Sequence, residues 1–170
     1  MAGPLVPEAW TIPLHLEEQY RRTGTPAPKP VSGFVLVDTG ATETCISLKA
    51  AEELGLLPRR MKRTYSAGGL ARNPVFWARL MIEIQTAVGT TTAGLDDEVV
   101  SVPHLEDSIR ALGIKVGAPR RSAAKVPVRL IGLLGRDLLR HATLLYEGTR
   151  AHFRLTFDEA SFQHRAVRRL

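Results

Sequence analysis

The sequence contains a single cysteine, Cys45, so no internal disulfide can stabilise the fold. We therefore expect a reducing compartment and predict a cytoplasmic protein. Residues 1–20 also lack an apolar run long enough for a signal peptide or a membrane span, because three prolines and a glutamate interrupt it. No membrane partner is expected.

Aromatic residues are scarce, at 6% of the chain, although the net charge is +6 and the pI is near 10. The basic side chains gather at residues 59–63 and 165–169, and no aromatic residue lies within either cluster. Proteins that bind single-stranded nucleic acid usually combine such charge with aromatic stacking platforms. We interpret the clusters as solvated surface and expect no nucleic-acid partner.

Closely spaced metal ligands are also missing. The five histidines are scattered along the chain, and the acidic pair Asp96-Asp97 is explained more simply by a turn. We therefore predict no metal and no cofactor. With 170 residues, of which 44% are hydrophobic, the chain suits one globular domain with a substantial core.

The most informative stretch is residues 33–47. Phe34 to Val37 form a short apolar run with two valines, which is typical of a buried strand. The run ends in Asp38, Thr39 and Gly40. A carboxylate at the end of an apolar strand is costly to bury unless it is hydrogen-bonded or takes part in chemistry.

Residues 35–41, with Asp38-Thr39-Gly40-Ala41, resemble the active-site signature of the aspartic proteases. A second element follows at residues 130–139, where Leu133-Leu134-Gly135-Arg136-Asp137 is similar to the run that opens a short helix in retroviral-type proteases, the retropepsins. The order and spacing of the two elements resemble a single retropepsin lobe over residues 31–157.

This resemblance implies a mainly β fold, a single-lobe acid-protease closed β barrel with one or two short helices and a flap hairpin. It divides the chain into an N-terminal strand with a proline-rich arm (1–30), a retropepsin-like domain (31–157) and a basic tail (158–170). The predicted elements include a strand at 10–16, a helix at 48–54, a strand at 75–84, a polar turn at 85–94 and a closing hairpin at 142–157. Residues 104–112 have helical spacing, and residues 114–127 are predicted to form an exposed loop.

The resemblance also implies roles for individual residues. Asp38 is the expected catalytic carboxylate, the Thr39 hydroxyl reaches across a dimer, and Gly40 lets the substrate backbone approach. Ala41 lacks the hydroxyl that pepsin-like enzymes carry at this position, so we expect a pH optimum nearer neutral than that of pepsin.

Substrate contacts are expected from four residues: Gly68 and Gly69 at the flap tip, and Leu133 and Leu134 on the pocket wall. Arg136 has a structural role. Its usual partner in retroviral enzymes is an aspartate, which Thr42 replaces here, and either Glu43 takes its place or the pairing is absent.

The single Asp-Thr-Gly determines the predicted mechanism. Hydrolysis of a peptide bond by aspartates requires two carboxylates that share a proton, one acting as base and the other as acid. This chain provides one such motif, so the second Asp38 would come from an identical copy. The prediction is an aspartic endopeptidase that acts on peptides as an obligate homodimer.

Two other functions stay open. Residues 38–42 also fit Asp-x-Gly-x-Thr, the phosphate loop of sugar kinases and actin-like proteins, and loosely the nucleophile loop of phosphatases. No second phosphate loop accompanies it. The other alternative is a catalytically silent dimerisation module with the same fold.

Overall fold

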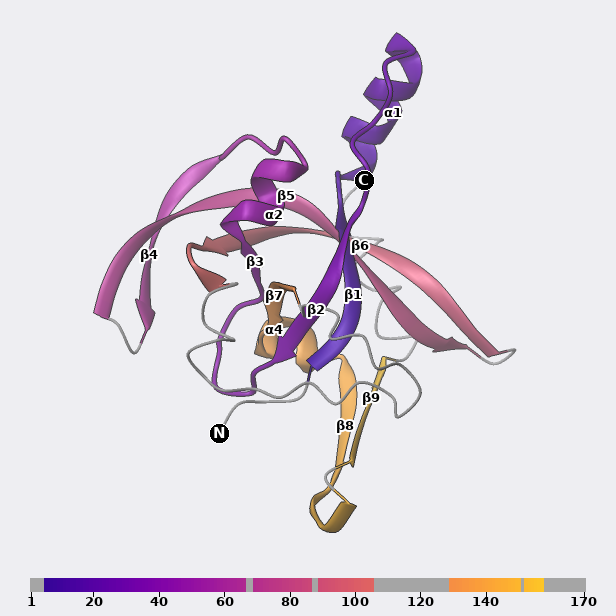
Figure 1. The fold of residues 1–170 in the computed structure, drawn as a ribbon, viewed down its shortest axis with the longest axis vertical. Helices are drawn as coiled ribbons and strands as arrows, with labels where there is room; N and C mark the ends of the chain where they lie inside the picture. The colour runs from indigo at the N-terminus through magenta and orange to yellow at the C-terminus, as the bar shows by residue number, and fades with distance from the viewer. Residues whose placement is uncertain (1–4, 67–68, 87–88, 106–128, 151, 158–170) are drawn as a thin grey trace, which may run out of the picture.

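The computed structural model describes residues 5–66, 69–86, 89–105, 129–150 and 152–157 (Figure 1). Strands make up most of this part of the chain. In chain order the elements are β1 (Leu5–Thr11), α1 (Leu14–Thr23), β2 (Val31–Val37), β3 (Cys45–Ser47), α2 (Leu48–Glu53), β4 (Arg60–Ser66), β5 (Gly69–Thr86), β6 (Gly89–Val102), β7 (Leu130–Leu134), α4 (Arg136–Leu139), β8 (Ala142–Glu147), the 3₁₀ helix η1 (Gly148–Arg150) and β9 (His152–Phe157).

Six strands close into a barrel. The sheet has the order β1-β2-β7-β3-β6-β5-β4, and β1 pairs with β5 as well as with β2, so the sheet returns on itself. Strand β4 lies outside the closed ring and extends β5, and β8 and β9 form a separate two-stranded sheet. The predicted mainly β, single-lobe closed barrel is therefore confirmed.

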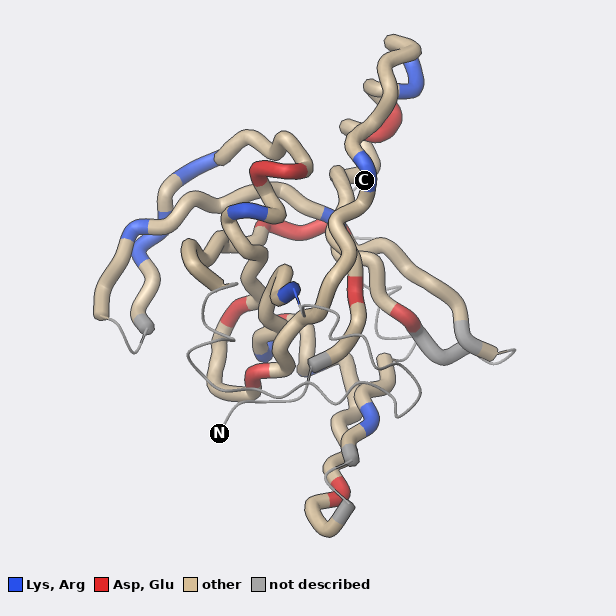
Figure 2. The backbone as a smooth tube through the Cα atoms, viewed as in Figure 1, with Lys and Arg blue, Asp and Glu red and all other residues tan. Residues whose placement is uncertain are grey.

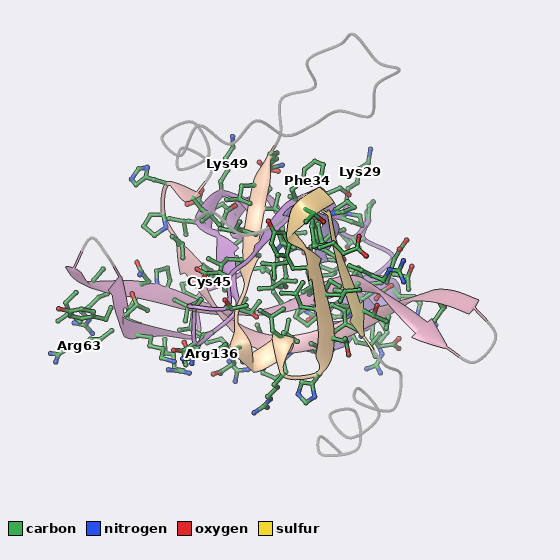
Figure 3. The ribbon with its side chains drawn as sticks, turned by 90° about the horizontal axis from the view of Figure 1, so that it is seen from below. Lys29, Phe34, Cys45, Lys49, Arg63 and Arg136 are labelled. Carbon is green, nitrogen blue, oxygen red and sulfur yellow. The ribbon has the colours of Figure 1, made fainter. Side chains whose placement is uncertain are left out.

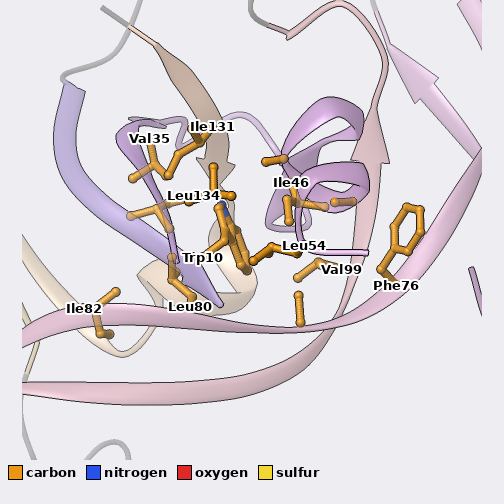
Figure 4. Close-up of a cluster of buried hydrophobic side chains, with 14 of the residues drawn as sticks. Trp10, Val35, Ile46, Leu54, Phe76, Leu80, Ile82, Val99, Ile131 and Leu134 are labelled. Atoms are coloured by element: carbon orange, nitrogen blue, oxygen red, sulfur yellow. The ribbon is translucent and has the colours of Figure 1, made fainter. Parts of the chain in front are cut away.

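The core fills the inside of this barrel (Figure 4). Trp10 from β1 is almost completely buried and packs against Gly132 on β7, where a Cβ atom would lie 2.9 Å from the indole nitrogen. Branched side chains such as Val35, Ile46 and Ile131 surround the ring. Burial of each such side chain contributes about 1.5–3 kcal/mol to folding.

The predicted helix after the first motif is confirmed as α2. The Ser47 hydroxyl accepts a hydrogen bond from the Ala50 N–H at 3.0 Å and caps its first turn. The helix ends with Gly55 in the left-handed region, at φ 63°, and the N–H groups of Gly55 and Leu56 bond back to the last turn. This Schellman arrangement satisfies two helix carbonyls.

The start of the chain differs from the prediction. The expected strand at residues 10–16 is wrong, because β1 occupies Leu5–Thr11 and α1 begins at Leu14, directly after Pro13. Among the described residues α1 is a third α-helix where one or two were expected, and none of its residues is buried. Its polar residues obscured the weak apolar periodicity of Leu16 and Tyr20, which pack on the edge of the core.

The expected polar turn at residues 85–94 is also wrong. Strand β5 continues to Thr86, and β6 begins at Gly89 and pairs with it residue by residue. The threonines at 90–92 are polar but β-branched, and branching at Cβ favours strands. The closing hairpin is confirmed as β8 and β9. The helical pattern at 104–112 falls outside the described residues after Leu105, as do the 114–127 loop and the 158–170 tail.

Strand β1 also carries an unusual carboxyl group. Burial, with the charge of Glu83 as the second cause, raises the pKa of Glu8 from 4.5 to about 8. Glu8 therefore holds a proton at neutral pH in the folded protein, although it loses that proton in the unfolded chain.

This difference predicts a pH dependence of stability. Between pH 5 and pH 8 the unfolded chain loses the Glu8 proton while the folded protein retains it, so the free energy of unfolding falls as pH rises, by up to about 1.4 kcal/mol per pH unit. Glu8→Gln removes this dependence. We expect the variant to gain stability over the wild type progressively from pH 5 to pH 8, measured by urea unfolding at each pH. Glu52→Gln, an exposed carboxylate on α2, is the matched control; equal pH profiles for the wild type and Glu8→Gln would contradict the assignment.

Candidate active site

Asp38 lies in a loop that is fixed at the end of β2. Its N–H donates to the Leu134 carbonyl at 3.0 Å, and its carboxylate Oδ1 accepts from the Gly40 N–H at 2.9 Å. The Ala41 N–H closes the turn by donating to the Asp38 carbonyl at 3.2 Å. A Cβ atom at position 40 would lie 3.1 Å from Oδ1, so glycine leaves room for the carboxylate in this orientation.

The parallel pairing of β2 and β7 brings the two sequence motifs together. Val37 is in register with Leu134, which places Asp38 beside the Gly135-Arg136-Asp137 turn. Helix α4 then packs on the loop that follows Asp38, because the Arg136 N–H donates to the Ala41 carbonyl at 3.0 Å and the Asp137 N–H to the Thr42 carbonyl at 3.3 Å. Residues far apart in sequence thus form one loop–helix unit.

The Asp137 carboxylate is fully engaged in holding this unit together. It accepts from the Thr44 N–H at 2.9 Å, from the Thr44 hydroxyl at 2.7 Å and from the Leu138 N–H at 2.8 Å. The buried Thr44 hydroxyl in turn accepts from the Gly135 N–H at 3.1 Å. Asp137 is therefore a structural residue at the start of α4, and its main partner, Thr44, was not predicted.

Arg136 bonds to Thr42 itself, which is neither of the two outcomes expected from the sequence. Its guanidinium Nη2 donates to the Thr42 hydroxyl at 3.2 Å, so the residue in the usual aspartate position retains a neutral form of the contact. Glu43 does not substitute for that aspartate, because its carboxylate forms an ion pair with Lys62 on β4. This ion pair links the β4–β5 hairpin to the loop that carries Asp38.

The other predicted site residues differ in how deeply the structure buries them. Thr39 and Gly40 are exposed. Ala41, which follows Asp38 closely in the chain, and Leu133, which pairs with Leu36 on β2, are half-buried. Leu134 is completely buried in the core, so its predicted place on the pocket wall is wrong; its side chain points to the inside of the barrel. Gly69 begins β5, and Gly68 lies outside the described residues.

Cys45 is next to this site but is not suited to nucleophilic chemistry. It lies on β3 (Figure 3), where its thiol is half-buried and approaches the Glu43 carbonyl at 3.5 Å. Burial, followed by the negative charges of Glu43 and Asp137, raises the pKa of the thiol to about 12. The thiol therefore stays protonated at neutral pH. In the described part of this loop Asp38 is half-buried and has no ion pair, whereas Glu43 is paired with Lys62.

No group of three or more His, Cys, Asp or Glu side chains in the described ranges is arranged to hold a metal ion. None of the helices that the structure describes is long and apolar enough to cross a membrane.

A family model described as aspartyl protease matches residues 29–138. The matched segment begins just before β2 and ends within α4, so it contains the Asp38 loop, the β4–β5 hairpin and the Gly135-Arg136-Asp137 turn. A search of curated proteins gives no match.

Proposed function

Because the chain belongs to the aspartyl protease family, we propose that it is an endopeptidase whose active site forms between two copies, each of which supplies Asp38. The observation that carries this proposal is the single Asp38 carboxylate, oriented by the Gly40 N–H at the end of an apolar strand. One carboxylate cannot act as base and acid in the same step, so the chemistry requires a second copy.

In the proposed reaction the two Asp38 carboxyl groups share one proton, because two neighbouring carboxylates do not both ionise readily. The ionised group accepts a proton from water as the water oxygen attacks the carbonyl carbon of the peptide. The protonated group donates its proton to the carbonyl oxygen, which gives a neutral diol. The diol then collapses, the carbon–nitrogen bond breaks, and the amine leaves with a proton returned from the dyad.

Neighbouring residues have supporting roles in this proposal. The exposed Thr39 hydroxyl bonds to the loop of the second copy, and Gly40 leaves space for an extended substrate backbone. The β4–β5 hairpin acts as the flap, with Gly69 near its tip and Leu133 facing the substrate. The Asp137–Thr44 hydrogen bonds support the proposal indirectly, because they fix the loop that positions Asp38.

We propose that the second copy docks on the β8–β9 hairpin. Helix α4, which is bonded to the Asp38 loop, leads directly into β8, and Figure 1 shows the hairpin extending away from the barrel. Its register places Leu144 and Tyr146 of β8 opposite Leu155 and Phe153 of β9 on one apolar face. This face continues outward from the core, and at its far end Tyr146 is 66% exposed. An exposed apolar face of this kind marks an interaction site.

Tyr146→Asp tests this interface. A charge buried against a second apolar face is costly, so we expect the dimer dissociation constant to rise by at least about tenfold. Analytical ultracentrifugation measures the change, and peptide cleavage should fall at low protein concentration and recover at high concentration. Thr143→Asp adds the same charge on the opposite face of β8 and is the control. Unchanged dimerisation of Tyr146→Asp would place the interface elsewhere.

The proposed activity is tested by incubating the purified protein with a mixture of unfolded proteins between pH 4 and pH 7. We expect internal cleavage of peptide bonds, detected by mass spectrometry, and no effect of Mg²⁺ or ATP. Absence of cleavage by a confirmed dimer would favour the silent dimerisation module, whereas thermal stabilisation by Mg²⁺ and ATP would favour the phosphate-loop function.

A further inference from the structure

The β4–β5 hairpin has one face that no described part of the protein covers. Directly paired residues in an antiparallel ladder share a face, and successive pairs alternate between the two faces. Three alternate pairs form what we call the outer hairpin face: Met61 with Pro74, Arg63 with Arg72, and Tyr65 with Leu70.

On the opposite face of the same hairpin, polar side chains have partners within the protein. Lys62 forms its ion pair with Glu43, and the Asn73 side-chain amide donates to the Thr64 hydroxyl at 2.6 Å. With the other described residues the outer face makes no such ion pair or hydrogen bond, and its apolar side chains are exposed in the structure: Tyr65 is 86% and Leu70 63% exposed. One face therefore makes contacts within the protein, and the other is exposed and available to a partner.

The region around this hairpin also carries an excess of positive charge. Residues 54–82 contain six Lys or Arg and no Asp or Glu. Four of the six have acidic partners elsewhere in the fold: Arg59 and Arg60 pair with Glu98, Lys62 with Glu43, and Arg79 with Asp96.

The remaining two cations are Arg63 and Arg72, which lie directly opposite each other on the outer hairpin face. Neither has an ion pair among the residues that the structure describes. Like charges in directly opposed positions destabilise a hairpin, so this arrangement gains from a bound carboxylate. Figure 2 shows the basic residues along the hairpin without any acidic residue, and Figure 3 shows Arg63 at its far end, away from the barrel.

The edge of the hairpin provides backbone groups for a partner. Strand β4 is the last strand in the sheet order, and it pairs with β5 alone among the described strands. An extended peptide can therefore add to this edge by main-chain hydrogen bonds. Alternate side chains of that peptide would lie beside Met61, Arg63 and Tyr65 on the outer face.

We propose that the outer hairpin face binds an extended acidic segment of a protein partner, with the pattern apolar–x–Asp/Glu–x–apolar, as a strand added to β4. The acidic residue lies beside Arg63, the nearer of the two guanidinium groups, and the apolar residues lie beside Met61 and Tyr65. Two unmatched cations between apolar side chains suit a peptide better than a nucleic-acid backbone, which needs a longer row of positive charge. The proposal does not rest on the chemistry of Asp38.

The test uses the Asp38→Asn variant, so that the peptide stays intact whether or not the wild type is a protease. The probe is the fluorescein-labelled peptide Thr-Ile-Thr-Glu-Thr-Phe-Thr, and the matched peptide carries Gln in place of Glu. Fluorescence anisotropy should show that the Glu peptide binds at least about fivefold more tightly. Adding Arg63→Gln should remove this preference and leave binding of the Gln peptide unchanged, and Arg72→Gln should reduce the preference less.

Arg21→Gln is the control, because it makes the same charge change on the exposed helix α1, where Arg21 pairs with Glu18. Equal affinity of the two peptides, or an effect of Arg21→Gln as large as that of Arg63→Gln, would overturn the proposal. The same holds if neither peptide binds but a single-stranded RNA oligonucleotide binds with a dependence on Arg63. Unchanged binding of the Gln peptide by Arg63→Gln shows that the variant keeps the folded hairpin, so loss of the preference for the Glu peptide then reports on the Arg63 charge.

Discussion

Asp38→Asn is expected to reduce peptide cleavage by about 10³- to 10⁴-fold while the fold and the dimer persist. An amide can still accept the Gly40 hydrogen bond through its oxygen, so the loop keeps its geometry. It can neither accept a proton from water nor share one with a second carboxyl group. The rate of cleavage of a fluorogenic peptide measures the loss, and analytical ultracentrifugation verifies the dimer.

The matched control for this variant is Glu52→Gln, which also exchanges a carboxylate for an amide, on the exposed surface of α2. Its cleavage rate should equal that of the wild type within about twofold, as expected for a surface change outside the site. Retention of more than a tenth of the wild-type rate by Asp38→Asn would show that cleavage does not depend on this carboxylate.

Gly135→Ala is expected to be the most destabilising single substitution in the candidate site. A Cβ atom at position 135 would lie 2.3 Å from the Glu43 carbonyl carbon and 2.4 Å from its oxygen. These are backbone atoms, which cannot rotate away, so the loop after Asp38 must separate from α4. We expect a loss of at least about 3 kcal/mol in the free energy of unfolding, measured by urea denaturation.

Gly148→Ala is the matched control for this prediction. Its Cβ atom would meet the Tyr146 ring at 3.5 Å, an ordinary contact, so the substitution should cost less than about 1 kcal/mol. If Gly135→Ala unfolds at the same urea concentration as the wild type, the close contact between α4 and the Asp38 loop does not exist in solution.

Several elements could be predicted because their signals are local. The apolar run before Asp38 specified β2, and Ser47 with Gly55 specified both ends of α2, since a cap and a left-handed glycine act within one turn of the helix. The resemblance to retropepsins added the relation between the Asp38 loop and the Gly135-Arg136-Asp137 turn, which no local pattern contains.

Other features depended on contacts between distant residues. The hydrogen bonds between Thr44 and Asp137 join positions 93 residues apart, and only the register of β2, β3 and β7 brings them together. The same is true of the ion pair between Glu43 and Lys62. Leu134 was assigned to the pocket because its apolar character fits a pocket wall and a core equally well; the strand register decides which face it occupies.

The central claim is that two copies of Asp38 form one active site, and mixing chains tests it most directly. Wild-type protein is combined with an equal amount of the Asp38→Asn variant, the subunits are allowed to exchange, and cleavage is measured at constant wild-type concentration. Random pairing leaves half of the wild-type chains in wild-type dimers, so the account predicts that activity falls to about half, and further with excess variant. Activity that stays constant at every ratio would show that each chain acts alone and would contradict the account.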